Sequence, residues 1–501
     1  MVEMAKGLLL LIGAITLVSV SDVSCRGLDA SIKLERQLFI SRRVVADEGE
    51  FDGGVLVDEN GIIEELLTRP AIDALLITDG DKIEVIDGGN IPLMAGGVDS
   101  HVHVNEPGRT SWEGYETATQ AAAWGGFTTI IDMPLNSIPP TTSVENLKTK
   151  TNVAKEEVYI DVGFWGGVIP GNQGELLNMI KAGVIGFKSF LSDSGVPEFP
   201  QVEPEDIEKA LNVLNGTEAV YAFHAEVTVD NVTSNENNEY DCEVPQIYTT
   251  YLATRPEQME LNAVKLLAGY IAKYDVHFHV VHVSAEGVVP ILEEARLQRL
   301  AAGNTRWRGG VTAETCHHYL TLSSEQVPPG NTEFKCSPPI RNNTNRQKLW
   351  EYIREKRLDL IASDHSPSVA TLKNPNFFDA WGGISSVQFG LSLFWTEAKA
   401  RGFGLETLTH YLSAGPARLA GLEKRKGALR KGLDADLIFF DPDASFIVTP
   451  EIIHYKNKLS PYMNRVLTGK VMQTYLRGRL IYSNGQLIGG PQGKLLLNDL
   501  E

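Results

Sequence analysis

The chain has 501 residues, of which 43% are hydrophobic and 22% charged, a composition typical of folded globular proteins and not of disordered or fibrous chains. At roughly 100 to 200 residues per domain, this length predicts several domains or one large barrel with additions. The formal net charge of −19 would repel a polyphosphate backbone, so we expect no binding to nucleic acids.

The N-terminus carries an apolar run at residues 7–20 (GLLLLIGAITLVSV), which follows Lys6. We interpret residues 1–25 as a signal peptide, with an uncleaved signal anchor or a disordered or transit-type extension as the alternatives. The run is shorter than the roughly 20 residues that a spanning helix needs, so we expect no stable membrane span after processing. This segment predicts the secretory pathway and the endoplasmic reticulum. Candidate glycan acceptors are then the sequons at Asn215, Asn231 and Asn342.

The two flanks of the remaining chain have the pattern of short strands. Residues 34–90 alternate apolar and polar positions, and Glu59-Asn60-Gly61 stands between two apolar runs like a hairpin turn. Residues 427–490 return to short strands without a helix-length apolar period. We expect the two flanks to combine into one small, discontinuous β-sandwich domain.

The central residues, 91–426, alternate apolar runs with helix-length segments, which is typical of parallel βα architecture. Eight such runs can be counted, at residues 92–104, 127–134, 159–168, 184–191, 219–226, 276–284, 311–320 and 359–367. Eight strands close a barrel, so the predicted fold class is α/β with a TIM-type (β/α)₈ barrel. The active site of such a barrel lies at the C-terminal ends of its strands.

Several of these runs end in residues that bind metals. His101 and His103 share one face of the first strand, so they could chelate one ion, although this spacing alone is common. Further candidates end later strands, namely His224, His282, His317, His318 and Asp364. Imidazole and carboxylate ligands suit Zn²⁺ and its neighbours among the divalent ions, so the combined set predicts a metal-dependent hydrolase.

The fourth strand contains Lys188 among apolar neighbours, where a charged ammonium group would be costly to desolvate. A neutral amine could capture CO₂, and the resulting carbamate could bridge two metal ions about 3.5 to 4 Å apart. The alternative is a strand-end lysine that extends its ammonium group to solvent. For His277 and His279 we expect packing or hydrogen bonding on the barrel wall, and for His365 a supporting role.

Together with longer motifs, these residues resemble the cyclic amidohydrolases of the amidohydrolase superfamily, and among them the plant-type allantoinases, over about residues 35–485. The motifs are NEPGRT (105–110), DMPLNSIPPTT (132–142), KSFLSDSGVPEFPQV (188–202) and KCSPPIR (335–341). The resemblance implies two divalent cations, zinc or else manganese or cobalt, and a carboxylated Lys188. The implied ligands are His101, His103, Lys188, His224, His282 and Asp364.

Departures from related branches narrow the expected substrate. Asn105 stands where dihydroorotases carry an arginine that binds a carboxylate, and Asp193 stands where dihydropyrimidinases typically carry a tyrosine. His317 replaces the usual proline of the motif on strand seven. The resemblance therefore implies hydrolysis of allantoin to allantoate in purine catabolism, with a hydantoinase or dihydropyrimidinase type of cyclic amidase as the alternative.

Two divalent cations would lower the pKa of a bound water, and we expect the resulting hydroxide to attack the ring carbonyl. Asp364 would accept the water proton and deliver it to the leaving nitrogen, while Asn136 and Ser337 would hold the substrate. We expect a homo-oligomer. A non-catalytic scaffold of the same fold and an unrelated barrel with core histidines are the other readings, and the complete ligand set argues against both.

Overall fold

The computed structural model describes residues 35–47, 49–229 and 244–498. The expected signal segment, 1–25, and the sequon at Asn231 lie outside these residues. The described residues form one compact unit. Over the described ranges, no helix has the length and apolar character needed to cross a bilayer.

The centre of this unit is a barrel of parallel strands, which confirms the predicted (β/α)₈ fold. Its strands are β6 (Gly97–Val102), β7 (Phe127–Asp132), β8 (Asp161–Phe164), β10 (Gly186–Phe190), β11 (Val220–His224), β12 (His277–Val280), β13 (Val311–Cys316) and β14 (Leu360–Ala362). The short strand β9 (Gly166–Gly167) continues the β8 run and pairs with β10. Each strand pairs in parallel with its neighbour in sequence order along β6-β7-β8 and β9 to β14.

The barrel closes where β14 meets β6. Val102 forms a parallel bridge with His365, and the His103 amide donates a 2.8 Å hydrogen bond to the His365 carbonyl. The amide of Ser363 also donates to the buried carboxylate of Asp99. The carboxyl ends of the first and last strands, which carry three of the predicted metal ligands, are therefore held side by side.

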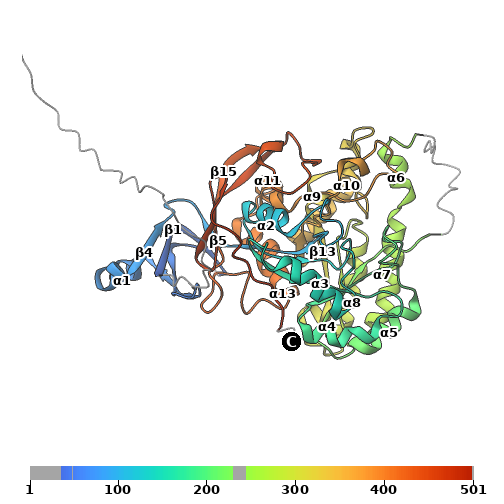
Figure 1. Cartoon of the computed structure of the whole chain (residues 1–501), viewed down its shortest axis with the longest axis horizontal. Coiled ribbons are helices and arrows are strands. Elements are labelled where there is room, and N and C mark those ends of the chain that lie inside the picture. Colours follow the sequence, from blue (N-terminus) through green and yellow to red (C-terminus); the bar gives the residue numbers. More distant parts are fainter. Residues whose placement is uncertain (1–34, 48, 230–243, 499–501) are drawn as a thin grey trace, which may run out of the picture. The chain divides into compact units, whose positions relative to one another are not determined.

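Helices alternate with these strands and surround them (Figure 1). They are α2 (Tyr115–Trp124), α3 (Val144–Ala154), α4 (Leu176–Ala182), α5 (Pro204–Leu214), α7 (Glu257–Ile271), α8 (Val288–Ala301), α10 (Asn343–Arg354) and α11 (Gly390–Ala400). Shorter helices are α6 (Tyr248–Thr254), α9 (His317–Thr321), α12 (Leu405–Thr409) and α13 (Gly415–Leu419), with a π-helical turn at His410–Ala414. Helix α5 illustrates their amphipathic pattern, because Ile207, Leu211 and Leu214 are buried on one face.

The two flanks of the chain form one nine-stranded sheet. Its strands are β1 (Arg36–Ala46), β2 (Gly49–Val57), β3 (Ile63–Thr68), β4 (Ile83–Asp87), β5 (Leu93–Ala95), β15 (Leu437–Ile447), β16 (Val466–Leu476), β17 (Arg479–Ser483) and β18 (Gln486–Leu487). The order is β18-β17-β16-β15-β5-β1-β2-β3, with β4 beside β1. Strand β5 bonds to both β1 and β15, so it joins the flanks into the discontinuous β domain expected from the sequence.

Two features of this region differ from the strand pattern. Residues Arg69–Asp79 form helix α1, because Pro70 fits the first helical turn and Ile72 packs with Leu38 and Leu56 in a small core. The run expected as the first barrel strand is divided between two sheets, with β5 in the small sheet and β6 in the barrel. A Cβ atom at Gly96 would lie 2.4 Å from Thr128 Cγ2, so only glycine lets the chain pass this close.

Candidate active site

A cavity of about 440 Å³ opens at the carboxyl ends of the barrel strands. The predicted site residues that line it are His103, Asn136, Lys188, His224, His282, Ser337 and Asp364. His101 is completely buried directly behind it, against Asp364. The structure therefore brings together the six implied ligands and the two expected substrate-binding residues, from positions up to 263 residues apart in the chain.

The first ligand group joins the end of β6 to the residue that follows β14. The nearest carboxylate oxygen of Asp364 lies 3.1 Å from His101 Nε2 and 3.4 Å from His103 Nε2. One ligand atom from each of the three residues falls within 4.8 Å of the others. Asp364 adopts a φ of +43°, an uncommon backbone conformation for a non-glycine residue that turns its side chain toward the two histidines.

The charges around this group favour a cation. Burial raises the pKa of Asp364, but His101, His103 and His282 together outweigh it, so the pKa lies well below its ordinary value. Burial lowers the pKa of His101, yet Asp364 and Glu314 raise it to about 9. Buried carboxylates thus stabilise positive charge on the His101 ring, whose Nε2 faces Asp364 at 3.1 Å.

The second ligand group consists of His224 at the end of β11 and His282 just after β12. His224 Nδ1 lies 3.0 Å from His282 Nε2, and the ring centroids are 4.6 Å apart. Burial lowers the pKa of both imidazoles well below the usual value, with the Lys188 charge adding to the effect. Both rings are therefore neutral at pH 7, which is the protonation state that binds metals.

Lys188 lies on β10 and lines the same cavity, paired in register with Ala222 of β11. Its side chain is buried, and Nζ lies 4.8 Å from the centroid of the Phe190 ring. Burial lowers the pKa of Lys188 to about 8, although Asp364 and Glu314 act in the opposite direction. A substantial fraction of this amine is therefore neutral near physiological pH, as the desolvation argument predicted.

Two buried glutamates that the sequence analysis missed orient the histidines. Glu314 on β13 has Oε1 2.5 Å from His101 Nδ1 and Oε2 3.2 Å from His279 Nε2. Glu226 has Oε2 2.7 Å from His224 Nε2. A carboxylate on one ring nitrogen fixes the tautomer and leaves the other nitrogen for a metal. The alternation of β13 places Glu314 and Cys316 on one face, which was the available signal.

The two proposed substrate-binding residues sit on loops around the same cavity. Asn136 has a φ of +39°, and its carbonyl accepts a 2.6 Å hydrogen bond from Arg109 Nη1. Ser337 Oγ lies 2.7 Å from the hydroxyl oxygen of Tyr251, which donates to the carbonyl of Cys336. Arg109 thus fixes the backbone at Asn136, and Tyr251 of α6 holds the side chain of Ser337.

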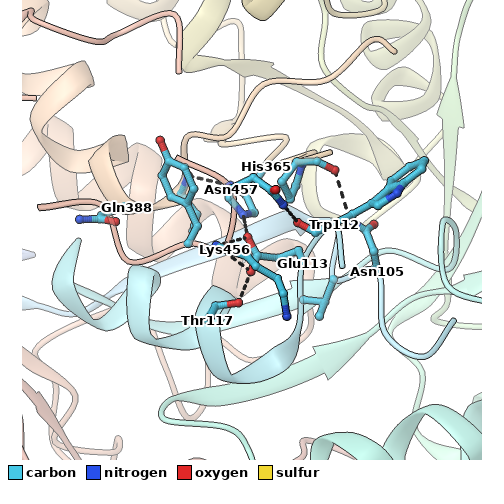
Figure 2. A network of polar contacts seen from close by, with 12 residues as sticks. Asn105, Trp112, Glu113, Thr117, His365, Gln388, Lys456 and Asn457 are labelled. Carbon is cyan, nitrogen blue, oxygen red and sulfur yellow. Dashed lines mark hydrogen bonds and ion pairs between the residues drawn. The ribbon is translucent and has the colours of Figure 1, made fainter. Parts of the chain in front are cut away.

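His365 belongs to a separate network (Figure 2). Its Nδ1 accepts a hydrogen bond from the Ser386 amide, so Nε2 carries the proton toward buried Glu113, 3.3 Å away. The same carboxylate accepts from Thr117 and from the amide of Lys456. His365 therefore ties the barrel to the segment around residue 456 and does not enter the cavity, which agrees with a supporting role.

Another cluster of acidic side chains in the described structure is neutralised by a lysine. Asp161, Asp434 and Asp436 lie close enough to suggest a metal site. However, Lys426 Nζ approaches all three carboxylates at 2.6 to 2.8 Å. This cluster is therefore an internal ion pair network.

The comparison with known proteins agrees with this geometry. A model of the amidohydrolase family matches residues 93–481, which is more than half of the chain. The chain belongs to the amidohydrolase family. Within the family, it is 41% identical to an allantoinase of Streptomyces avermitilis over 91% of this chain and 97% of that protein. It is 40% identical to an allantoinase of Arabidopsis thaliana over 91% of this chain and 90% of that protein.

Solved structures of this family share the fold. An L-hydantoinase (dihydropyrimidinase) from Arthrobacter aurescens superposes with a TM-score of 0.82 at 25% identity, covering 93% of this chain and all of that one. The chain is thus a hydrolase of the amidohydrolase family and of its allantoinase branch. The family and the clustered histidine and carboxylate side chains together indicate a divalent metal cofactor.

Proposed function

We propose that this amidohydrolase opens the hydantoin ring of allantoin by hydrolysing a ring amide, which yields allantoate. The observation that carries the proposal is one cavity lined by three histidines, one lysine and one aspartate, with His101 buried behind it, in a chain about 40% identical to allantoinases along most of its length. A cyclic amidase of the hydantoinase type is the alternative, because the solved structures with this fold include hydantoinases.

The residues present fit two divalent cations. The buried His282 Nδ1 has no hydrogen-bond partner in the described structure, and the buried His101 Nε2 faces the Asp364 carboxylate, as metal-binding atoms would. His101, His103 and Asp364 would hold one ion, and His224 and His282 the other. Zinc suits these ligands, as do manganese and cobalt. When bound, such ions acidify a water molecule and polarise a carbonyl group.

Lys188 would link the two ligand groups. Its neutral amine would add to CO₂ and lose one proton, which gives a carbamate with two oxygen donors and a negative charge. The low pKa that burial imposes on Lys188 favours this reaction at physiological pH, because only the unprotonated amine has the necessary lone pair. The ordinary lysine pKa would leave very little of that form.

Asp364 is the proposed proton carrier. It is ionised at neutral pH because His101 lowers its pKa, and it lines the cavity beside the ligand groups. In the reaction, one water adds to the ring carbonyl carbon and the bond from that carbon to nitrogen breaks. Asp364 accepts the proton that the water loses and transfers it to the departing nitrogen. Asn136 and Ser337 would position the ring.

The test is a ring-opening assay on purified protein with its metal content measured in parallel. We expect allantoate from allantoin, about two metal ions per chain, and faster turnover of allantoin than of hydantoin or a dihydropyrimidine. Faster turnover of the dihydropyrimidine would favour the alternative function. Loss of activity on chelation and recovery with zinc, manganese or cobalt would identify the metals that support the reaction.

Two further proposals concern the whole protein. Residues 1–25 would direct the chain to the endoplasmic reticulum, and the exposed side chains of Asn215 and Asn342 would be open to glycosylation. Expression in a secretory host should then yield protein that begins near residues 22–26, and intact Met1 in a cytosolic pool would contradict this. Homo-oligomerisation is the second proposal, and light scattering after size-exclusion chromatography tests it.

A further inference from the structure

Two oppositely charged side chains at the cavity have no part in the proposed reaction. Asp193 follows strand β10, five residues after Lys188, and its side chain is exposed. Arg255 is the C-cap residue of α6 and is partly exposed, with 24% of its side chain accessible. Both line the same cavity as the metal-ligand residues.

Arg255 is anchored close to the second ligand group. Its Nη1 donates to Glu226 Oε2, the oxygen that also contacts His224 Nε2. Burial lowers the pKa of Arg255, but Glu226, Tyr251 and, to a smaller extent, Asp193 together raise it above its ordinary value. Glu226 therefore holds the guanidinium group close to His224, and part of the planar guanidinium is accessible from the cavity.

Asp193 is fixed on the neighbouring loop. Its Oδ1 accepts a 3.0 Å hydrogen bond from the amide of Gly195, whose φ of +83° suits this tight turn. The charge of Asp193 influences Arg255, yet no ion pair joins these two described side chains. A fixed acceptor and a fixed donor thus border one cavity without satisfying each other.

A ureido group is planar, with a carbonyl acceptor and N–H donors on different edges. We propose that Asp193 and Arg255 form a subsite for the open ureido tail of allantoin, in which the carboxylate accepts from the tail N–H groups and the guanidinium donates to the tail carbonyl. This inference rests on the proposed function. The tail is attached to the ring carbon next to a ring carbonyl, so a substrate held at the ligand residues keeps its tail a few bonds away.

The subsite predicts which part of the substrate each side chain recognises. A neutral urea group offers both donors and an acceptor, so it needs partners of both kinds. Hydantoin itself has the ring without the tail, so it would form no hydrogen bonds with Asp193 and Arg255. Asp193 and Arg255 would therefore distinguish a ureido-substituted ring from a bare ring by hydrogen bonds that only the former can make.

The experiment compares allantoin as substrate with hydantoin as competitive inhibitor, in the metal-loaded enzyme. We expect Asp193→Ala to raise KM for allantoin by about 10- to 100-fold, the loss usual for a charge-assisted hydrogen bond, with kcat within about threefold. The inhibition constant of hydantoin should change less than about twofold. Asp193→Asn keeps the turn but loses the charge, so its KM for allantoin should lie between those of the parent enzyme and Asp193→Ala.

Arg255→Lys keeps a positive charge beside Glu226 and removes the planar fork. We expect a similar rise in KM, with the metal content of the parent enzyme. Asp379→Asn is the matched control, because Asp379 is another exposed carboxylate that lines this cavity. It should leave both constants near the parent values.

Several outcomes would overturn the subsite. Equal weakening of allantoin and hydantoin in Asp193→Ala, no change in either, or the same rise in KM in Asp379→Asn would each do so. Loss of metal in Arg255→Lys would show that Arg255 acts through Glu226 and His224, and would remove it from the subsite. A parent enzyme that does not hydrolyse allantoin would instead contradict the proposed function, so the two failures are distinguishable.

Discussion

The Nδ1 atom of His101 lies 2.5 Å from Oε1 of Glu314, and both side chains are almost completely buried. The same glutamate oxygen accepts a hydrogen bond from the His282 amide, and the other carboxylate oxygen contacts His279. One side chain on β13 thus orients residues from β6 and β12. Because Glu314 contacts Nδ1 of His101, the other ring nitrogen, Nε2, faces Asp364.

Replacing Glu314 with Gln tests this arrangement. The amide keeps the size of the side chain but loses the charge that holds His101, so we expect metal affinity to fall by about 10- to 100-fold, as for other residues that support a ligand. Metal content after equilibration in a metal buffer, measured beside kcat, is the readout. Glu351→Gln on the exposed face of α10 is the control and should retain both. Unchanged affinity in Glu314→Gln would contradict the orienting role.

Lys188→Ala tests the carbamate. Since Lys188 is the proposed link between the two ligand groups, its loss should remove much of the metal and abolish measurable hydrolysis. Short carboxylates added to the buffer should restore part of the activity, because they can replace the missing oxygen donors. If the variant keeps two metal ions and full activity, the carbamate hypothesis is wrong.

Asp364→Asn separates proton transfer from metal binding. The amide retains an oxygen donor but not the basicity, so the variant should keep appreciable metal. Its kcat should fall by more than the roughly 10² to 10⁴-fold usual for loss of a general base. His101→Asn should instead lose metal and activity together, because it removes half of a chelating pair. Metal per chain and kcat are measured in both. Near-parental turnover in Asp364→Asn would mean that another group, such as His318, carries the proton.

Lys373 should give the protein a specific pH dependence of stability. This lysine is partly buried and donates to the carbonyls of Trp381 and Gly383, and desolvation lowers its pKa to about 7. Between pH 7 and the ordinary lysine value near 10.5, the unfolded chain binds more protons at this residue than the folded chain. The contribution of Lys373 to stability therefore rises with pH through this window and is constant below it.

The measurement is the difference in free energy of unfolding between the parent and Lys373→Met at several pH values. We expect the difference to shift in favour of the parent from about pH 7 to about pH 9.5, and to be flat below pH 6. Subtracting the variant cancels the titration of other groups. A difference that does not change with pH would show that Lys373 titrates normally.

Much of the site follows from local sequence. Alternation in a strand places His101 and His103 on one face, and the order of eight apolar runs places His224, His282 and Asp364 at one end of a parallel barrel. The low pKa of Lys188 also follows from its apolar neighbours, since desolvation depends on burial and not on a particular partner. The sequence by itself therefore determined the barrel and its candidate ligands.

The supporting contacts were decided by tertiary structure. Glu314 lies 213 positions from His101 in the sequence. Asp193 interacts electrostatically with Arg255 only because the loop after β10 and the end of α6 border one cavity. Helix α1 and the division of the first strand at Gly96 likewise depend on which surfaces pack against them. A periodic pattern records whether a side chain is buried, but a hydrogen bond or an ion pair also requires a particular partner at a particular distance, and only the folded chain brings that partner into place.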